Sequence, residues 1–283
     1  MPLALILSSY VAASRVGGGG QLFALPPFGI DPVLVPTTLF GRHPGKGAPG
    51  GGAVAPEVFE SAVQAALDEV ALVHADAAIA GYFAFPEQVS VAARAIDALR
   101  AAPDRRPISG RLVVVIDPIM GDADTGLYVR PEVAAALTNV LVPRADWLTP
   151  NVWELERLTG LPATTPAEAA AVARRLGRPT LVTSVPAGEG EIAVLCVTAD
   201  AARLFAHPRY DAVPRGTGDL ITAVFTAGLI EGLEPLAAAE RATRAAAEAA
   251  RACVDWGATE LPLVALRDRL THPSAAVRVE DVP

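Results

Sequence analysis

The sequence contains a single lysine, Lys46, among its 283 residues. A P-loop needs a lysine after a GxxxxG spacing and a Ser or Thr directly behind that lysine. Around Lys46 the spacing from Gly41 to Gly45 is one residue short, and Gly47 follows the lysine. Because the chain has no other lysine, a P-loop is excluded, and any bound phosphate must be held by another structure.

Basic charge, cysteine and long apolar runs are also scarce. The 23 Lys and Arg residues face 31 Asp and Glu residues, which argues against nucleic acid or an anionic membrane as the main partner. Cys196 and Cys253 form no metal-ligand pattern, and Cys196 lies in an apolar run, which indicates a small core residue. Two cysteines without a disulfide framework are typical of a reduced, cytoplasmic protein. No apolar run approaches the roughly 20 residues that cross a bilayer. The short run Leu3–Leu7 lacks a basic leader, so it indicates a buried strand rather than a signal peptide.

Several catalytic patterns are missing as well. Gly17–Gly20 gives no GxGxxG in register, which argues against a nicotinamide-dependent dehydrogenase. Neither HExxH nor triad spacing occurs among the four histidines, which are His43, His74, His207 and His272. Of these, His43 in a glycine-rich stretch is the candidate for a functional role.

The sequence does contain short apolar runs that alternate with longer helical patterns, which is typical of β-α-β units and predicts an α/β fold with a mostly parallel sheet. The expected strands are Leu3–Ser8, Val33–Thr37, Ala77–Tyr82, Leu112–Ile116, Trp147–Thr149, Thr180–Thr183, Ile192–Thr198 and Arg203–Ala206. The expected helices are Pro56–Val73, Pro86–Ala102, Pro131–Val140, Asn151–Thr159, Pro166–Leu176, Asp219–Glu231, Pro235–Asp255 and Leu263–Leu270. The last two strands have no long helix between them, which predicts an antiparallel edge.

Two glycine-rich stretches interrupt this alternation. Gly17–Gly20 is expected to be irregular, because it lies between the first strand and the break at Pro26-Pro27. Gly41–Gly52 is too rich in glycine for a regular element and is predicted to form a mobile flap, at about 41–52. Nothing resembles a linker between two cores, so residues 1–283 are expected to form a single domain.

Polar residues recur at or just after the carboxyl ends of the predicted strands. In an open parallel sheet these ends meet at one edge, where ligands bind. Every strand must end in something polar, but so many aligned polar ends beside a Gly-Thr-Gly-Asp turn favour a binding site. The residues in these positions are Ser9, Thr37, Tyr82, Asp117, Thr149, Asn151, Thr183 and Ser184.

The strongest motif is the sequence Arg-Gly-Thr-Gly-Asp at positions 215–219, directly before an apolar helix. Glycines at a helix start let consecutive backbone N–H groups point at one anion, which the helix dipole also favours. Asp219 could then accept the proton of an alcohol aligned with a bound phosphate. The alternative is that Asp219 is only the N-cap of the helix.

Two acidic motifs could hold a metal ion. Asp117, Asp122 and Asp124 lie in one loop after a strand, and three carboxylates suggest a hard cation such as Mg²⁺, although a solvated acidic turn explains them equally well. An EF-hand is excluded, because the twelfth position from Asp122 is Val133. In the segment 149–154, Asn151 and Glu154 have the spacing of a capping box, while Glu154 could also face a metal and its waters.

Taken together, six motifs in order resemble the ribokinase superfamily, and within it the pyridoxal kinases, over roughly residues 3–255. The motifs are Ser9-Tyr10-Val11, Thr37…Phe40…His43, Gly81-Tyr82, Asp117-Pro118-Ile119-Met120-Gly121, Thr149-Pro150-Asn151…Glu154 and Gly216-Thr217-Gly218-Asp219. The resemblance implies a three-layer αβα sandwich, usually a homodimer, that uses ATP and Mg²⁺ to phosphorylate pyridoxal; whether a monovalent cation assists stays open.

The resemblance also implies roles for single residues. Asp219 would be the general base, with the anion hole formed by Gly216, Thr217 and Gly218. Asp117 and Glu154 would bind Mg²⁺ and phosphate. The ATP side would include Thr149, Asn151, Thr183, Val213 and Pro214. The pyridine ring of the vitamin would be held by Ser9, Val11, Thr37, His43 and Tyr82.

Departures from the family pattern concern the vitamin side. Ala12-Ala13-Ser14 replaces a stretch that usually includes glycine, Gly18 stands where the family often has Asn, and the flap lacks its usual aromatic. Alternatives are a hydroxymethylpyrimidine or sugar kinase of the same fold, or a vitamin-binding protein without catalysis. Hydroxymethylpyrimidine kinases typically carry Cys at the position of Asp219, which favours the pyridoxal branch.

Overall fold

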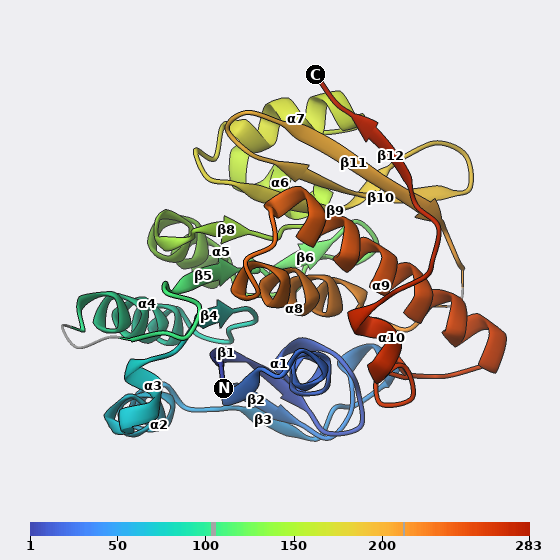
Figure 1. Cartoon of the computed structure of the whole chain (residues 1–283). Helices are drawn as coiled ribbons and strands as arrows, with labels where there is room; N and C mark the ends of the chain where they lie inside the picture. Colours follow the sequence, from blue (N-terminus) through green and yellow to red (C-terminus); the bar gives the residue numbers. More distant parts are fainter. Residues whose placement is uncertain (103–105, 212) are drawn as a thin grey trace.

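A ten-stranded sheet forms the centre of the computed structural model, which describes residues 1–102, 106–211 and 213–283. Its strands are β1 (Leu3–Val11), β2 (Asp31–Phe40), β3 (Gly51–Ala53), β4 (Ala77–Ala80), β5 (Val113–Ile116), β8 (Trp147–Leu148), β9 (Thr180–Pro186), β10 (Glu191–Val197), β11 (Ala202–Pro208) and β12 (Arg278–Asp281). They are ordered β12-β11-β10-β9-β8-β5-β4-β1-β2-β3 (Figure 1).

The pairing confirms a mostly parallel sheet with an antiparallel edge. β2, β1, β4, β5, β8 and β9 pair in parallel. β10 and β11 run antiparallel, as predicted, and β12 adds a further antiparallel strand at that edge. At the opposite edge β3 pairs antiparallel with β2.

Helices cover both faces of the sheet, which gives three layers (Figure 1). They are α1 (Gly17–Ala24), α2 (Pro56–Asp68), α3 (Val70–Val73), α4 (Pro86–Ala101), α5 (Pro131–Ala136), α6 (Val152–Thr159), α7 (Pro166–Arg174), α8 (Thr217–Ile230), α9 (Pro235–Trp256) and α10 (Arg267–Thr271). Short 3₁₀ or π segments are η1 (Pro26–Phe28), η2 (Pro44–Lys46), η3 (Leu137–Leu141) and η4 (Val142–Arg144), and a small hairpin is formed by β6 (Gly121–Asp122) and β7 (Gly126–Leu127).

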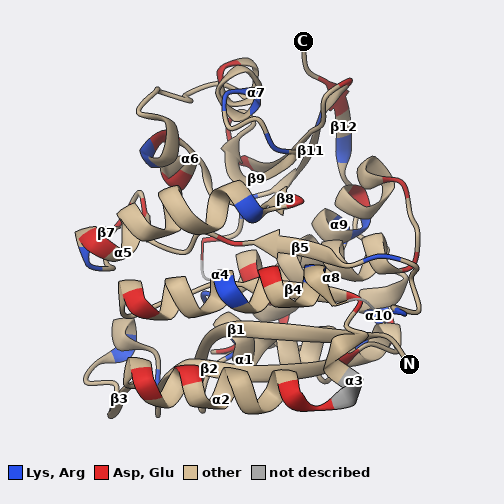
Figure 2. Ribbon diagram, turned by 90° about the vertical axis from the view of Figure 1, so that its left-hand side faces the viewer, with Lys and Arg blue, Asp and Glu red and all other residues tan. Residues whose placement is uncertain are grey.

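The alternation of side chains along β1 shows how the two hydrophobic cores arise. Successive strand residues point to opposite faces, so Ile6 joins the core under α1, α8 and α9, while Leu5 and Leu7 join the core under α2 and α4. Trp147 and Phe225 pack edge to face in the first core, with ring centroids 4.8 Å apart. The central strands β1, β4 and β5 contain no charged residue, whereas charged residues mark the outer helices α2 and α4 and the edge strand β12 (Figure 2).

The glycine run at 17–20 differs from the prediction, because it begins helix α1 instead of an irregular segment. A Cβ atom on Gly18 would lie 2.5 Å from Leu34 Cδ1, and one on Gly20 would lie 2.6 Å from the Arg15 carbonyl oxygen. Glycine therefore permits the helix to pack directly against the sheet and the preceding loop. This close approach offsets the low helix propensity of glycine.

Other predicted bounds also need correction. The predicted helix Pro56–Val73 is divided at Glu69, whose backbone is extended, into α2 and α3. The predicted helix Leu263–Leu270 is reduced to α10, and the glycine-rich stretch 41–52 does contain regular structure, namely η2 and the start of β3. Within the described residues, no helix is both long and apolar enough to cross a membrane.

Candidate active site

The predicted site residues come from neighbouring strands at one edge of the sheet. Ser9 and Thr37 lie near the carboxyl ends of β1 and β2, Tyr82 follows β4, and Asp117 follows β5. Thr149 follows β8, and the first turn of α8 carries Asp219. Because β4, β1, β5, β8 and β9 are parallel, their carboxyl ends share this edge, as the sequence predicted.

Thr37 and Tyr82 are in contact, and Ser9 lies at an irregularity in the pairing of β1 with β2. The strand register shifts between Ser8 and Tyr10, which changes the direction of side chains at the strand end. Thr37 Oγ1 donates a hydrogen bond to the Tyr82 carbonyl oxygen at 2.7 Å, and the Tyr82 N–H donates to Ser8 Oγ at 3.1 Å. Val11, at the end of β1, is buried in this region. Thr37 and Tyr82 thus lie together at this part of the sheet edge, and Ser8, the neighbour of Ser9, contacts Tyr82.

The glycine-rich flap is attached to two other segments through Glu260. Lys46 forms an ion pair with the Glu260 carboxylate and donates to the Thr259 carbonyl oxygen at 2.8 Å. Glu260 also accepts hydrogen bonds from Ser14 Oγ at 2.7 Å and from the Arg15 N–H at 3.0 Å. Ser14, which departs from the family pattern, therefore takes part in holding the flap to the first loop. No local sequence pattern indicates this network, since Lys46 and Glu260 are 214 residues apart.

His43 lies in the same flap and caps η2, because its Nδ1 accepts the Gly45 N–H at 3.0 Å. Burial lowers the pKa of His43, and the nearby guanidinium of Arg215 lowers it further. Neutral imidazole is therefore the favoured form. Arg215 directly precedes the Gly-Thr-Gly-Asp turn, so its electrostatic effect on His43 places the flap close to the start of α8.

We expect Glu260→Gln to speed cleavage of the flap by a lysine-specific protease about two- to fivefold. Exposed ion pairs contribute about 0.2–1 kcal/mol, and Lys46 is half exposed, so loss of the charge should open the flap only modestly. Lys46 is the single lysine in the chain, so cleavage yields one pair of fragments that a gel quantifies. Glu60→Gln, which breaks an exposed ion pair with Arg94, is the control. Equal rates for wild type and Glu260→Gln would show that the ion pair does not hold the flap.

The helix that carries Asp219 begins two residues earlier than predicted. α8 starts at Thr217, and its N-cap is Gly216 with φ 116°, so Asp219 is not an N-cap residue. A Cβ on Gly216 would lie 2.3 Å from the Arg15 carbonyl oxygen, whereas one on Gly218 would meet nothing within 4 Å. Glycine is thus required at 216 by close packing, while the space beside Gly218 is open. A glycine turn at a helix N-terminus leaves backbone N–H groups available to an anion.

Asp219 is chemically distinct from an ordinary surface aspartate. Its Oδ1 is shielded from solvent and has no hydrogen-bond partner among the described residues. Burial raises the pKa of Asp219 to about 6, although the backbone N–H groups of Gly17 and Asp219 itself favour the charged form. The residue as a whole is only partly buried, and a carboxylate with such a shielded, unpaired oxygen can accept a proton near neutral pH.

Asp117 and Glu154 are buried as whole residues, and specific donors contact each of them. Glu154 Oε1 accepts the Met120 N–H at 2.9 Å and the Gly121 N–H at 3.4 Å, while Oε2 accepts the Asn151 N–H at 2.9 Å. Burial raises the pKa of Glu154 to about 8, although these three N–H donors lower it by favouring the charged form. Burial raises the pKa of Asp117 well above its usual range, and the charges of Glu154 and Asp219 raise it further.

The capping box predicted at Asn151 and Glu154 is confirmed, since the Asn151 Oδ1 accepts the Glu154 N–H at 2.8 Å. Asn151 Nδ2 also donates to the Gly121 carbonyl oxygen at 2.9 Å. Glu154 therefore has two structural functions, because it caps α6 and fixes the loop after β5. The capping box alone does not explain the contacts to Met120 and Gly121.

The three aspartates of the loop after β5 do not form one cluster, contrary to the interpretation of that loop as a carboxylate site. Asp122 forms an ion pair with Arg215 and accepts the Thr125 N–H at 2.8 Å and the Asp124 N–H at 3.0 Å. Among the described residues, no group of three or more His, Cys, Asp or Glu side chains is placed to hold a metal. Instead, the Arg215–Asp122 pair joins the loop to the turn before α8.

The remaining predicted residues lie at the ends of β8 and β9 and before α8. The Thr183 N–H donates to the Pro150 carbonyl oxygen at 2.9 Å, and Thr183 pairs with Asn151 in a parallel bridge. Val213 and Pro214 are partly buried, and Val213 packs against the core under α8. Ser184, next to Thr183, has φ 60°, a left-handed conformation uncommon for a residue with a side chain.

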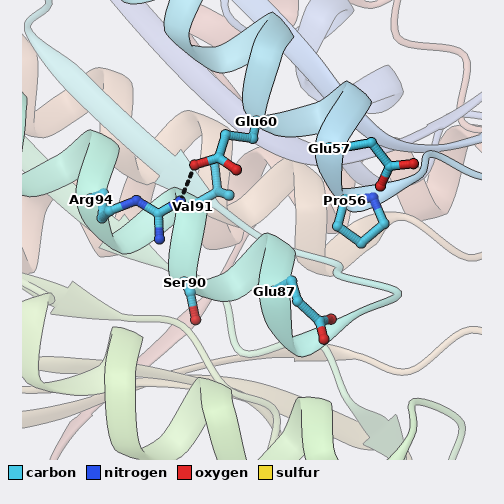
Figure 3. Close-up of a pocket in the computed structure, with 7 residues that line it drawn as sticks. All are labelled: Pro56, Glu57, Glu60, Glu87, Ser90, Val91 and Arg94. Atoms are coloured by element: carbon cyan, nitrogen blue, oxygen red, sulfur yellow. Dashed lines mark hydrogen bonds and ion pairs between the residues drawn. The ribbon is translucent and has the colours of Figure 1, made fainter.

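A surface hollow between α2 and α4 contains none of the predicted site residues (Figure 3). Glu60 and Arg94 face each other across it and form an ion pair. The hollow is lined by Pro56, Glu57, Glu60, Glu87, Ser90, Val91 and Arg94. It is therefore separate from the site at the strand ends.

Comparison with known proteins agrees with this arrangement. Residues 55–264 match the family model described as phosphomethylpyrimidine kinase. The pyridoxine/pyridoxal/pyridoxamine kinase of Bordetella avium is 35% identical over 98% of this chain and 92% of its own length. Pyridoxal kinase PdxY of Leifsonia xyli is 31% identical over 98% of this chain and 99% of its own length.

Solved structures share the whole fold. Pyridoxal kinase from Entamoeba histolytica superposes with a TM-score of 0.87, at 25% identity, over 100% of both chains. Pyridoxal kinase from Leishmania donovani in complex with ADP and pyridoxine superposes with a TM-score of 0.89, at 23% identity, over 99% of each chain. The three-layer fold and these matches define a ribokinase-like phosphotransferase. The chain belongs to the pyridoxal kinase family of these enzymes, as its six motifs predicted.

Proposed function

We propose that this protein transfers the γ-phosphate of ATP to the hydroxymethyl group of pyridoxal and so forms pyridoxal 5′-phosphate. The observation that carries the proposal is Asp219, whose Oδ1 is shielded from solvent and unpaired among the described residues, in the first turn of α8 beside the open space at Gly218. The relatives named above are kinases of B6 vitamers, and one solved relative is complexed with ADP. Both facts support ATP as phosphate donor and a vitamin as acceptor.

Asp219 would act as the general base. An alcohol is a poor nucleophile at neutral pH, so its proton must be accepted as the oxygen attacks phosphorus. The backbone N–H groups of Gly216, Thr217 and Gly218 would stabilise negative charge on the transferred phosphoryl group, as donors arranged in advance do at other anion sites. Asp219 and the anion cradle lie on the same turn, so base and phosphate are aligned by local structure.

Ser9, Val11, Thr37, His43 and Tyr82 would bind the pyridine ring. Thr37 and Tyr82 already contact each other, and Ser9 lies at the adjoining register shift. The ring of Tyr82 would pack against the face of the pyridine. Thr149, Asn151, Thr183, Val213 and Pro214, from the opposite part of the edge, would bind ATP.

Asp117 and Glu154 would suit a divalent cation held through its waters rather than by a cluster of direct ligands, since the described residues contain no such cluster. Burial raises the pKa of Asp117, and the charges of Glu154 and Asp219 raise it further, so a nearby cation would favour the ionised form of this carboxyl group. Asp117 and Glu154 would hold Mg²⁺ through its waters, and the cation would neutralise phosphate charge and orient ATP. Both Glu154 oxygens already accept backbone N–H groups, so its contribution would be negative charge rather than a free ligand atom, and a bound cation would favour that charged form against the effect of burial.

A substrate panel tests the proposed acceptor. Pyridoxal is expected to give the highest kcat/KM among pyridoxal, pyridoxine, pyridoxamine, hydroxymethylpyrimidine and ribose, with ADP release measured by a coupled assay. Hydroxymethylpyrimidine is the second candidate, because the matching family model is described as a phosphomethylpyrimidine kinase. Preference for the pyrimidine or the pentose would contradict the B6 assignment. Vitamin binding without ADP release would instead indicate a binding protein that lacks catalysis.

A further inference from the structure

Thr222 connects the helix of the proposed base to two other loops of the site. It lies three residues after Asp219 on α8, on the same side of the helix, and is fully buried. Its Oγ1 lies 3.1 Å from Asp117 Oδ2 and 2.9 Å from Thr149 Oγ1. In the part of the chain that the structure describes, no other α8 side chain hydrogen-bonds to either Asp117 or Thr149.

The chemistry of the three groups gives this chain of hydrogen bonds a direction. A hydroxyl has one hydrogen to donate, whereas an ionised carboxylate can only accept. With Asp117 ionised, Thr222 donates to Asp117, and its lone pairs accept the hydroxyl hydrogen of Thr149. The lone pairs of Thr149 are then directed away from Thr222 and are available to donors on a ligand.

The use of the Thr222 hydroxyl is unusual for a threonine inside a helix. Such hydroxyls commonly bond back to the carbonyl four residues earlier. Thr226, one turn further along α8, does this: its Oγ1 donates to the Thr222 carbonyl oxygen at 2.7 Å. Thr222 instead bonds to residues 105 and 73 positions away in the sequence.

We propose that Thr222 is a positioning residue for phosphotransfer, which fixes Asp117 and Thr149 relative to the helix that carries Asp219. The proposal rests on the function proposed above, because Asp117 is there assigned to Mg²⁺ and Thr149 to ATP. One hydroxyl would thereby couple the nucleotide side of the site to the catalytic base. Since a displacement of about 1 Å in such a site can cost roughly 10²-fold in rate, loss of this contact should act mainly on kcat.

The test compares Thr222→Val, which keeps the shape but removes the hydroxyl, with Thr222→Ser, which keeps the hydroxyl. Thr226→Val is the matched control, because Thr226 is an equally buried threonine on the same helix. For Thr222→Val we expect kcat to fall about 10- to 100-fold, with KM for pyridoxal within about threefold of wild type. Calorimetry without Mg²⁺ should show weaker ADP binding. Thr222→Ser and Thr226→Val should stay within about threefold of wild type in both measurements.

Three outcomes would overturn the proposal: near-normal kcat in Thr222→Val, an equal loss in Thr226→Val, or a loss in Thr222→Ser as large as in Thr222→Val. If Thr222→Val does not fold, Thr222→Ala against Thr222→Ser gives the same comparison, since both lack the methyl group and only Ser has a hydroxyl. Wild-type enzyme that is inactive on pyridoxal would contradict the proposed function instead, so the two failures are distinguishable.

Discussion

Asp219→Asn is expected to reduce kcat about 10²–10⁴-fold with KM for pyridoxal nearly unchanged, because the substitution removes the base but keeps the size of the side chain. Asp219 is not the N-cap of α8, so no capping interaction is lost. Interaction of a first-turn carboxylate with the helix dipole contributes about 0.3–1 kcal/mol, and burial of the charge opposes it. The melting temperature should therefore change by only a few degrees.

Steady-state kinetics and thermal unfolding of purified Asp219→Asn check this expectation. Asp268→Asn is the control, since Asp268 is an exposed aspartate in the first turn of α10, away from the site. The control should keep wild-type turnover. If Asp219→Asn is unfolded, its inactivity does not distinguish a catalytic base from a structural residue. ADP binding is therefore measured alongside, to show that the variant is folded.

Asp117→Asn and Glu154→Gln are expected to raise the Mg²⁺ concentration for half-maximal activity about 10- to 100-fold, while vitamin binding stays close to wild type. The two variants should differ in stability. Glu154 accepts three backbone N–H groups, and a glutamine amide would turn a donor toward some of them, which costs about 1–3 kcal/mol of unfolding free energy.

Mg²⁺ titrations of activity and chemical denaturation measure the two effects. If both variants keep wild-type Mg²⁺ dependence, Glu154 is only a structural residue that caps α6 and fixes the loop at Met120, and Asp117 does not act on the metal. If only Asp117→Asn raises the Mg²⁺ requirement, then Asp117 acts on the metal and Glu154 has a structural role alone.

The parts of the fold that could be predicted are those that depend on local pattern. β1 and β5 are short apolar runs, and the carboxyl ends of parallel strands must share an edge, so the grouping of Ser9, Thr37 and Asp117 followed from sequence. Helix α1 could not be predicted from its glycines, because the helix depends on contact with Leu34 and Arg15. β12 was also missed, since its four residues are exposed and show no apolar pattern.

The site divides in the same way. The motifs predicted the residues that are proposed to contact the ligands, including the Gly216–Asp219 turn. They did not reveal the contacts that hold those residues, because the partners are distant in sequence: Thr222 with Asp117, Lys46 with Glu260, and Arg215 with Asp122. Nor did spacing decide whether the aspartates of the loop after β5 converge, because the direction of Asp122 depends on Arg215 and Thr125.

The pH dependence of pyridoxal phosphorylation tests the central claim most directly. Asp219 must be ionised to accept a proton, and burial raises its pKa to about 6, so wild-type kcat/KM should fall as the pH is lowered through about 6. The residual activity of Asp219→Asn, measured over the same range with saturating Mg²⁺ and ATP, should lack this decrease. An identical acidic decrease in wild type and Asp219→Asn, with similar turnover, would contradict the assignment of Asp219 as the base.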